Sequence, residues 1–223
     1  MCKFFSFVGD GFGNYLYSDW QDRQNKTFEP DSHTAILTRN KVSPNRQDKW
    51  SKYEYNPLMK KFTIDEPVDW HNHEAARNWV ESLNFKNVVP ELVIKPIINP
   101  LQGKAKKVSK KEIELLTQWS SVWASTRNSI GVNVWDSVWN SVGKSVRESI
   151  WDSVRDSVGA SVLNYIMNSV EAYYSSFFDI QYKYDFSSCI KLWESGFVSS
   201  FNGKTWRLHS GKNAEVVYEW TKE

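Results

Sequence analysis

The sequence contains few side chains whose type and spacing suit chemistry, and the first of these are two histidines. His71 and His73 stand in the segment WHNHE. In an extended segment alternate residues share a face, so both imidazoles could bind one metal ion. On a helix the two side chains lie about 200° apart, and only Glu74 is near as a third ligand. We interpret both histidines as polar residues at the start of a helix, and we predict neither a metal site nor a cofactor.

Cys2 is the candidate nucleophile. A Met that precedes a small residue is usually removed, and Cys2 would then carry its thiol beside a free α-amine, as acyl or amide transfer requires. His33 in DSHT and His209 in WRLHSG each stand alone, and no Ser, His and acid spacing joins them. We therefore predict no catalytic residue and keep Cys2 as a weak alternative. Beside His209, Trp206 and Arg207 could line a polar cleft.

A tetrapeptide array occupies residues 121–170. The second position is β-branched in all thirteen units, and the first position is Ser in eleven of them. The third position of the first ten units is always Trp, Arg or Gly. These three residues share no shape, and a packed core that exchanged them would lose roughly 3 to 5 kcal/mol per cavity. We therefore expect the third position to face outward and the β-branched row to be sheltered.

Exposed Trp and Arg are typical of binding surfaces, because both are frequent interface hot spots and both stack on flat ligands. The alternative is neutral drift in an expanding repeat whose variable face touches nothing. The predicted binding residues of the array are Trp123, Arg127, Trp135, Trp139, Arg147, Trp151 and Arg155.

The helical interpretation of the array has a geometric difficulty. Four residues advance about 400° on an α-helix, so the β-branched row drifts about 40° per unit. Breaks near Gly131, Gly143 and Gly159, or a right-handed wrap of helices, would resolve this drift. A strand would leave neither face apolar. We favour helices, because helical spacing is also present on both sides of the array.

Local patterns predict strands at both ends of the chain. Residues 3–8 and 15–17 flank the turn GDGFGN and form a hairpin. The glycines of this turn do not form a phosphate loop, since a strand rather than a helix follows them. WSKYEY and KKFTID form a second hairpin, and Asn202-Gly203 indicates a third, with a last strand over 215–220. Residues 35–37 suggest a further short strand.

Two helices are predicted outside the array. Helical spacing begins at Asp69, and a second helix begins at Ser109, where Ser109 and Glu112 can form a capping box. The prolines of VVPELVIKPII restrict that segment to a sheet edge or to irregular structure. The segment QGKAKKVSKK is interpreted as a solvated hinge rather than a nucleic-acid contact, because no aromatic residue lies among its lysines.

The predicted fold class is α+β. A small antiparallel β body would be built from the N- and C-terminal hairpins, with a long helical arm, continuous or broken, that carries the array. The predicted segments are a β-rich body with one helix over 1–101, a basic linker over 102–111, the arm over 112–178, and a helix with a hairpin that completes the body over 179–223.

Composition excludes several classes of protein. Hydrophobic residues make up 40% and charged residues 24%, which is typical of folded proteins. The net charge of +2 gives no general attraction to nucleic acid or to an anionic membrane. The two cysteines have no metal spacing, and no apolar stretch approaches the roughly 20 residues of a spanning helix. We therefore expect a cytoplasmic protein that binds neither membrane nor nucleic acid.

Four segments together resemble a known family. They are MCKFFSFV, KYEYNPLMKKFTID, the array itself and GKTWRLHSGK. The chain is similar over most of its length to a family found mainly in tailed-phage and related mobile-element genomes, with arrays of variable length. No activity or site accompanies this family. The resemblance implies a small accessory protein in the host cytoplasm rather than a part of the virion.

These patterns favour a non-enzymatic interaction protein. It would bind a host protein or other macromolecule through the Trp and Arg of the array, in order to counter a host defence system. One alternative is a sponge that sequesters a signalling nucleotide, since Trp and Arg suit a base and a phosphate. Another is an N-terminal-cysteine amidohydrolase or acyltransferase. A drifting apolar row also favours self-association, so we expect a homo-oligomer.

Overall fold

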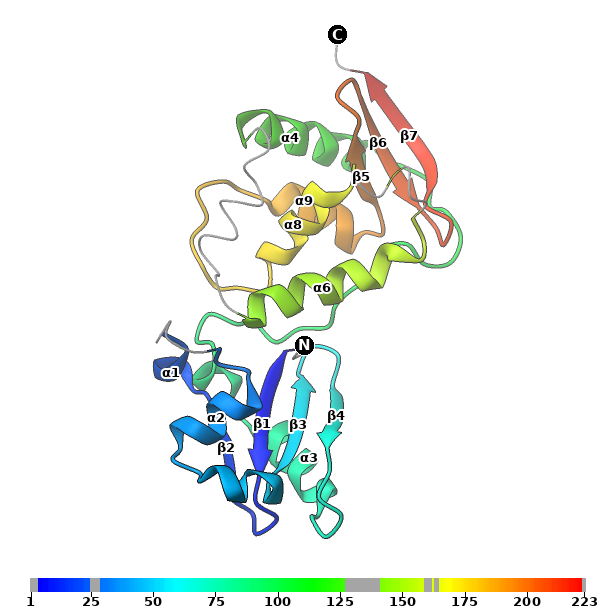
Figure 1. The fold of residues 1–223 in the computed structure, drawn as a ribbon. Coiled ribbons are helices and arrows are strands. Elements are labelled where there is room, and N and C mark those ends of the chain that lie inside the picture. Colours follow the sequence, from blue (N-terminus) through cyan, green and yellow to red (C-terminus); the bar gives the residue numbers. More distant parts are fainter. Residues whose placement is uncertain (1–3, 25–28, 127–140, 159–161, 163–164, 222–223) are drawn as a thin grey trace. The chain divides into compact units, whose positions relative to one another are not determined.

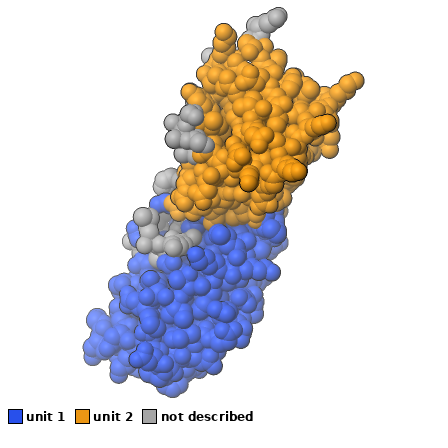
Figure 2. Space-filling view, turned by 90° about the vertical axis from the view of Figure 1, so that its right-hand side faces the viewer, with its two compact units in different colours: residues 1–96, 140–145 blue, residues 97–139, 146–223 orange. Residues whose placement is uncertain are grey.

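The structure is a computed structural model that describes residues 4–24, 29–126, 141–158, 162 and 165–221. It confirms the α+β class (Figure 1). The chain forms two compact units, residues 1–96 with 140–145 (unit 1) and residues 97–139 with 146–223 (unit 2), as coloured in Figure 2. Each unit has its own antiparallel sheet, so the N- and C-terminal hairpins do not build the single β body that was predicted. The two N-terminal hairpins instead pair with each other in one sheet, and the C-terminal strands pair among themselves in the other.

The sheet of unit 1 has four strands in the order β2-β1-β3-β4. Both N-terminal hairpins are confirmed, because β1 pairs with β2, β3 pairs with β4, and β1 and β3 join the two hairpins. The strands are β1 (Phe5–Gly9), β2 (Tyr15–Tyr17), β3 (Ser51–Asn56) and β4 (Lys61–Glu66).

Short helices cover this sheet. Residues 35–37, predicted as a strand, lie in a helix, because Ser32 accepts a hydrogen bond from the amide of Ala35 at 3.4 Å and starts the helix there. The helices of unit 1 are α1 (Trp20–Gln24), α2 (His33–Arg39), α3 (His73–Ser82) and the 3-10 helices η1 (Pro44–Lys49) and η2 (Phe85–Asn87).

The two faces of the sheet bury different residues. Val8 packs with Ile36 and Leu37 of α2, while the neighbouring Phe7 lies 5.0 Å from the ring of Trp79 in α3. Consecutive strand residues point to opposite faces, so α2 and α3 cover opposite sides of the sheet (Figure 1). The core of unit 1 is therefore mainly aliphatic on one face and aromatic on the other.

Unit 2 combines helices with a three-stranded sheet of order β5-β6-β7. Helix α9 packs against α4 and α8, and both α8 and α9 contact β5, so α4 and α8 of the predicted helical arm are packed within unit 2 rather than free. The elements are α4 (Lys110–Thr126), α6 (Ser141–Arg155), α8 (Met167–Ser175), α9 (Ser187–Glu194), β5 (Val198–Phe201), β6 (Thr205–Ser210) and β7 (Glu215–Thr221); the first residues of α6 belong to unit 1.

Two local predictions for unit 2 have different outcomes. The capping box is confirmed, because the amide of Ser109 donates to Glu112 Oε2 at 3.0 Å and the amide of Lys111 donates to Ser109 Oγ at 3.2 Å. The basic segment is not a free hinge. The amide of Lys106 donates to Ser210 Oγ at 3.2 Å, and its Nζ donates to the carbonyl of Ser195 at 2.7 Å. Backbone and side-chain hydrogen bonds thus hold this segment in unit 2.

Candidate functional site

The β-branched row of the array is sheltered in most of the described units. In α6, Val142, Val146, Ile150 and Val154 are all completely buried. From Val142 to Val154 the row turns by about 120° around the helix axis. Ser145 and Ser149, beside this row, are buried as well. A wide arc of the α6 surface is therefore buried, and over a helix of this length that arc accommodates the drift of the β-branched row. Val158, Ile166 and Val170 are buried too, whereas Val122 and Val162 are partly exposed.

The helix runs through Gly143 without a break. It ends at Arg155, four residues before Gly159, and helix α8 starts at Met167. The helical interpretation is thus confirmed for array residues 121–126, 141–155 and 167–170, whereas residues 156–158 and 165–166 form turns and bends. Gly131 and Gly159 lie outside the described residues.

The third position of the array has two kinds of environment. In α6, Trp151 is partly exposed and the side chain of Arg155 is 57% exposed. Arg147 instead forms an ion pair with the buried Glu171 of α8. The Trp123 ring lies 4.6 Å from the ring of Phe201, so it packs against the sheet of unit 2. Arg127, Trp135 and Trp139 lie outside the described residues.

The three candidate cleft residues of β6 do not share one face. Trp206 is buried, with its ring 4.7 Å from the ring of Phe201. Arg207 and His209 point to the opposite side, since strand side chains alternate, and there Arg207 pairs with Glu219 at 2.6 Å. The structure thus separates Trp206 from the other two residues.

His209 is a buried residue with both ring nitrogens occupied. Its Nδ1 donates to the carbonyl of Ala214 at 3.0 Å, and its Nε2 lies 2.8 Å from Ser200 Oγ. Burial lowers the pKa of His209, so the ring is neutral at pH 7. These contacts describe a satisfied core histidine that joins β6 to its neighbours.

Two imidazole–hydroxyl pairs lie beside the start of β3 in unit 1. His71 Nδ1 lies 2.7 Å from Ser51 Oγ, and the Tyr53 hydroxyl lies 2.9 Å from His73 Nδ1. Ser51 Oγ also accepts the amide of Val68 at 2.9 Å. Burial lowers the pKa of His71, and the neighbouring His73 lowers it further. His73 is the first residue of α3, as the prediction of a helix start requires.

His71 supports an exposed aromatic pair. The rings of Phe12 and Trp70 lie 5.2 Å apart, and these residues are 81% and 57% exposed. His71 Nε2 is buried without a hydrogen-bond partner among the described residues, and the backbone of Gly11 covers it. A Cβ on Gly11 would lie 2.6 Å from that nitrogen. In this conformation the imidazole therefore holds the loop and does not reach a substrate.

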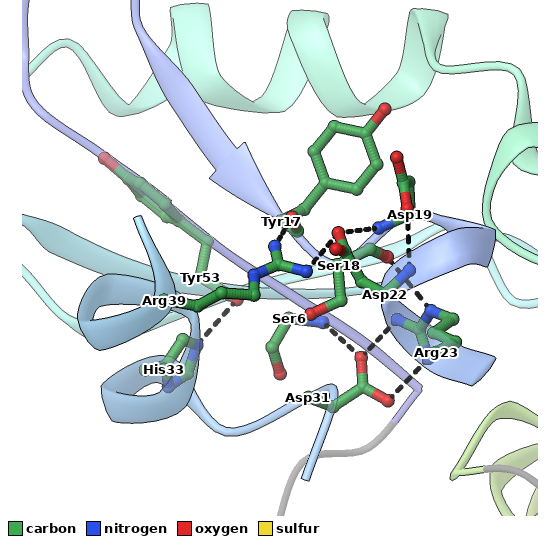
Figure 3. A network of polar contacts seen from close by, with 10 residues as sticks. All are labelled: Ser6, Tyr17, Ser18, Asp19, Asp22, Arg23, Asp31, His33, Arg39 and Tyr53. Atoms are coloured by element: carbon green, nitrogen blue, oxygen red, sulfur yellow. Dashed lines mark hydrogen bonds and ion pairs between the residues drawn. The ribbon is translucent and has the colours of Figure 1, made fainter. Parts of the chain in front are cut away.

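In unit 1, a buried ion pair lies on the side of the sheet that α2 covers, opposite to the side that α3 covers (Figure 3). Arg23 donates to both carboxylate oxygens of Asp31, at 2.9 and 2.6 Å, and its Nε donates to the carbonyl of Ser18 at 3.0 Å. Asp31 also accepts the amide of Ser6 in β1 at 3.3 Å. His33 lies nearby and donates from Nε2 to the carbonyl of Tyr53 at 3.0 Å. These groups tie α1 and α2 to the sheet, so their role is structural.

The sequence did not predict the partners of these charged and polar residues. Ser51 and Tyr53 stand 20 residues before the histidines that they contact. Their alternation on a predicted strand could have placed both hydroxyls on one face. The sequence does not indicate that this face lies against the start of α3, because such a contact depends on the tertiary fold.

The cysteines give no active thiol in the described part of the chain. Burial raises the pKa of Cys189 to about 12, so its thiol is protonated and unreactive at pH 7. Cys2, the weak catalytic candidate, lies outside the described residues.

Two kinds of feature are absent from the described ranges. No group of three or more His, Cys, Asp and Glu side chains there is arranged to hold a metal ion. None of the described helices has both the length and the apolar character that crossing a membrane requires. Comparison of the chain with protein-family models, with curated proteins and with solved structures finds no match.

Proposed function

We propose that the chain is a non-enzymatic interaction protein that binds a host macromolecule through the outward face of its array. The resemblance to phage and mobile-element proteins supports an accessory role in the host cytoplasm, directed against a defence system. The same proposal includes self-association of the chain. The proposed binding rests on this interpretation of the array, and the proposed localisation rests on the resemblance.

The observation that carries the proposal is the division of α6 into two faces. The second-position residues Val146, Ile150 and Val154 are completely buried. The third-position residues Trp151 and Arg155 reach solvent. At the exposed third positions of α6, a repeat can vary its contacts while the packing of the buried row stays constant. This arrangement favours a binding surface over a purely structural helix.

Trp151 and Arg155 are neighbours on the surface of α6. They stand four residues apart, so their side chains lie one turn from each other. Arg155 forms ion pairs with Asp152 at 3.1 Å and with Asp156 at 3.7 Å, and both carboxylates are mostly exposed. Exposed ion pairs of this kind contribute little to stability. The guanidinium can therefore exchange these carboxylates for those of a partner at small cost.

A capture experiment with matched variants tests the proposal. Tagged full-length protein is incubated with a bacterial lysate, and retained proteins are quantified by mass spectrometry. The test variant is Trp151→Ala/Arg155→Ala. The control is Trp70→Ala/Arg77→Ala, which also removes an exposed Trp and an exposed Arg, but from unit 1. We expect a partner that the wild type and the control retain and that the test variant loses at least tenfold.

The outcome also separates the other two functions. Equal retention by all three proteins would show that this face is not the binding surface. A nucleotide found by native mass spectrometry in the protein as purified would indicate the sponge. A chain without Met1 that carries an acyl group on Cys2 would indicate the transferase.

A further inference from the structure

Unit 2 contains an open pocket that none of the array residues lines. It lies between the end of α8, the connection 178–186 and the first turn of α9, and its volume is about 520 Å³. Pockets for small molecules and cofactors typically measure about 300 to 1,000 Å³. The pocket is therefore large enough for a ligand of two or three fused rings.

Aromatic and aliphatic side chains form about half of the pocket walls. Phe178 and Phe186 are almost completely buried, so they form a fixed floor, while Tyr182 and Tyr184 are partly exposed. The rings of Tyr182 and Phe186 lie 5.9 Å apart. The apolar lining consists of Phe178, Ile180, Tyr182, Tyr184, Phe186 and Ile190. Flat side chains of this kind suit a flat apolar ligand body.

The serine hydroxyls of the lining donate to the protein itself. Ser175 Oγ donates to the carbonyl of Ala172 at 2.7 Å, and Ser176 Oγ donates to the carbonyl of Tyr173 at 2.6 Å. Ser187 Oγ donates to Asp185 at 3.0 Å. These hydroxyl protons are not available to a ligand, so polar recognition must come from other groups.

The charged groups of the pocket favour an anion. The Lys183 ammonium lies 5.3 Å from the centre of the Tyr184 ring, and no carboxylate forms an ion pair with it within the described ranges. Asp185 accepts the amide of Ser187 at 2.8 Å at the start of α9, and this hydrogen bond lowers the pKa of its carboxyl group. Asp185 is therefore committed to the helix, while Lys183 can take a ligand anion.

Tyr182 contributes a second polar group. Its hydroxyl is buried without a hydrogen-bond partner among the described residues. Burial raises the pKa of Tyr182, so the hydroxyl remains protonated and is a donor. A buried donor without an acceptor is costly for the protein alone. A ligand oxygen that met it after a change in the χ1 torsion of Tyr182 would remove that cost.

We infer that this pocket binds a planar aromatic anion, whose rings lie on the aromatic walls and whose negative group pairs with Lys183 and accepts from Tyr182. The site is separate from the face proposed for the array. It therefore stands or fails independently of that proposal.

Three naphthalene probes that share one ring system and carry a negative, a neutral or a positive substituent test the inference. Binding of 2-naphthoate, 2-naphthalenemethanol and 2-naphthylmethylammonium to the full-length protein is measured by titration calorimetry. We expect 2-naphthoate to bind most tightly and the ammonium compound least tightly. Lys183→Met should weaken 2-naphthoate about tenfold, as the loss of a charge-assisted contact predicts, and leave the neutral probe unchanged. Lys204→Met, which removes an exposed lysine of the β5–β6 turn, is the matched control.

Tyr182→Phe separates a ligand contact from a structural role. Without probe, this variant should melt at the same temperature as the wild type or higher, because it removes a buried donor that lacks a partner. It should nevertheless bind 2-naphthoate more weakly. The inference is overturned if 2-naphthoate does not bind, if Lys183→Met and Lys204→Met bind it equally, or if the ammonium probe binds as tightly.

Discussion

Unit 1 and helix α6 bury their apolar residues in different ways. In unit 1, the Phe7 ring lies 4.9 Å from Tyr53, 6.4 Å from Phe62 and 5.0 Å from Trp79. These rings come from β1, β3, β4 and α3, so each element must be in place for the others to pack. In α6, one repeated step along a single helix supplies a β-branched residue per turn.

This difference shows how much sequence change each region can absorb. Large rings packed at fixed angles tolerate few substitutions, because a smaller side chain leaves a cavity that the neighbours cannot fill. Val and Ile differ by one methylene group, and both occur in the buried row of α6. We therefore expect substitutions in the two regions to differ in cost, and the outward face of the array to be the region free to vary.

Phe7→Ala should have the largest effect. Loss of this fully buried ring should lower the free energy of unfolding by about 3 to 5 kcal/mol, because the rings around it belong to separate elements. Urea denaturation gives the free energy, and hydrogen exchange of peptides from 5–9 and 51–56 locates the loss in unit 1. Phe12→Ala, at a residue that is 81% exposed, is the control and should change stability by less than about 0.5 kcal/mol. Equal costs for the two variants would contradict the packing described for Phe7.

Arg147→Ala and Arg155→Ala form a pair that tests the third position of the array. Arg147 pairs with Glu171, whose side chain is 5% exposed, whereas the partners of Arg155 are exposed. We expect Arg147→Ala to cost about 1.5 to 3 kcal/mol, because it removes a charged partner from a buried carboxylate. Arg155→Ala should cost less than about 0.5 kcal/mol. Equal values in urea denaturation would show that the two positions are equivalent, as the repeat alone suggests.

Local sequence patterns predicted much of the fold. The hairpins around GDGFGN, Asn56-Pro57 and Asn202-Gly203, the capping box at Ser109 and the helix that includes His73 are all present. Each of these depends on residues within a few positions of one another. The short apolar run of residues 35–37 suggests a strand, but the N-cap at Ser32 starts a helix there.

Features that depend on distant contacts could not be predicted. Nothing in the sequence indicates that the hairpins form two sheets instead of one, or that Ser210 fixes the amide of Lys106 from 104 residues away. The array shows the same limit. Its period predicted the buried row, but only the position of Glu171 on α8 explains why Arg147 pairs with a buried carboxylate while Arg155 pairs with exposed ones.

Ile150→Val should have the smallest effect on the core. It removes one methylene group from a completely buried side chain, and such changes typically cost about 0.5 to 1.5 kcal/mol. Val already occupies the same row one turn away on each side, at Val146 and Val154, so the backbone of α6 accepts the shorter side chain without adjustment. Urea denaturation of Ile150→Val beside Phe7→Leu measures the contrast directly. If Ile150→Val cost as much as Phe7→Leu, the row in α6 would be packed as specifically as the aromatic core, and the array could not lengthen or shorten by whole units without loss of stability.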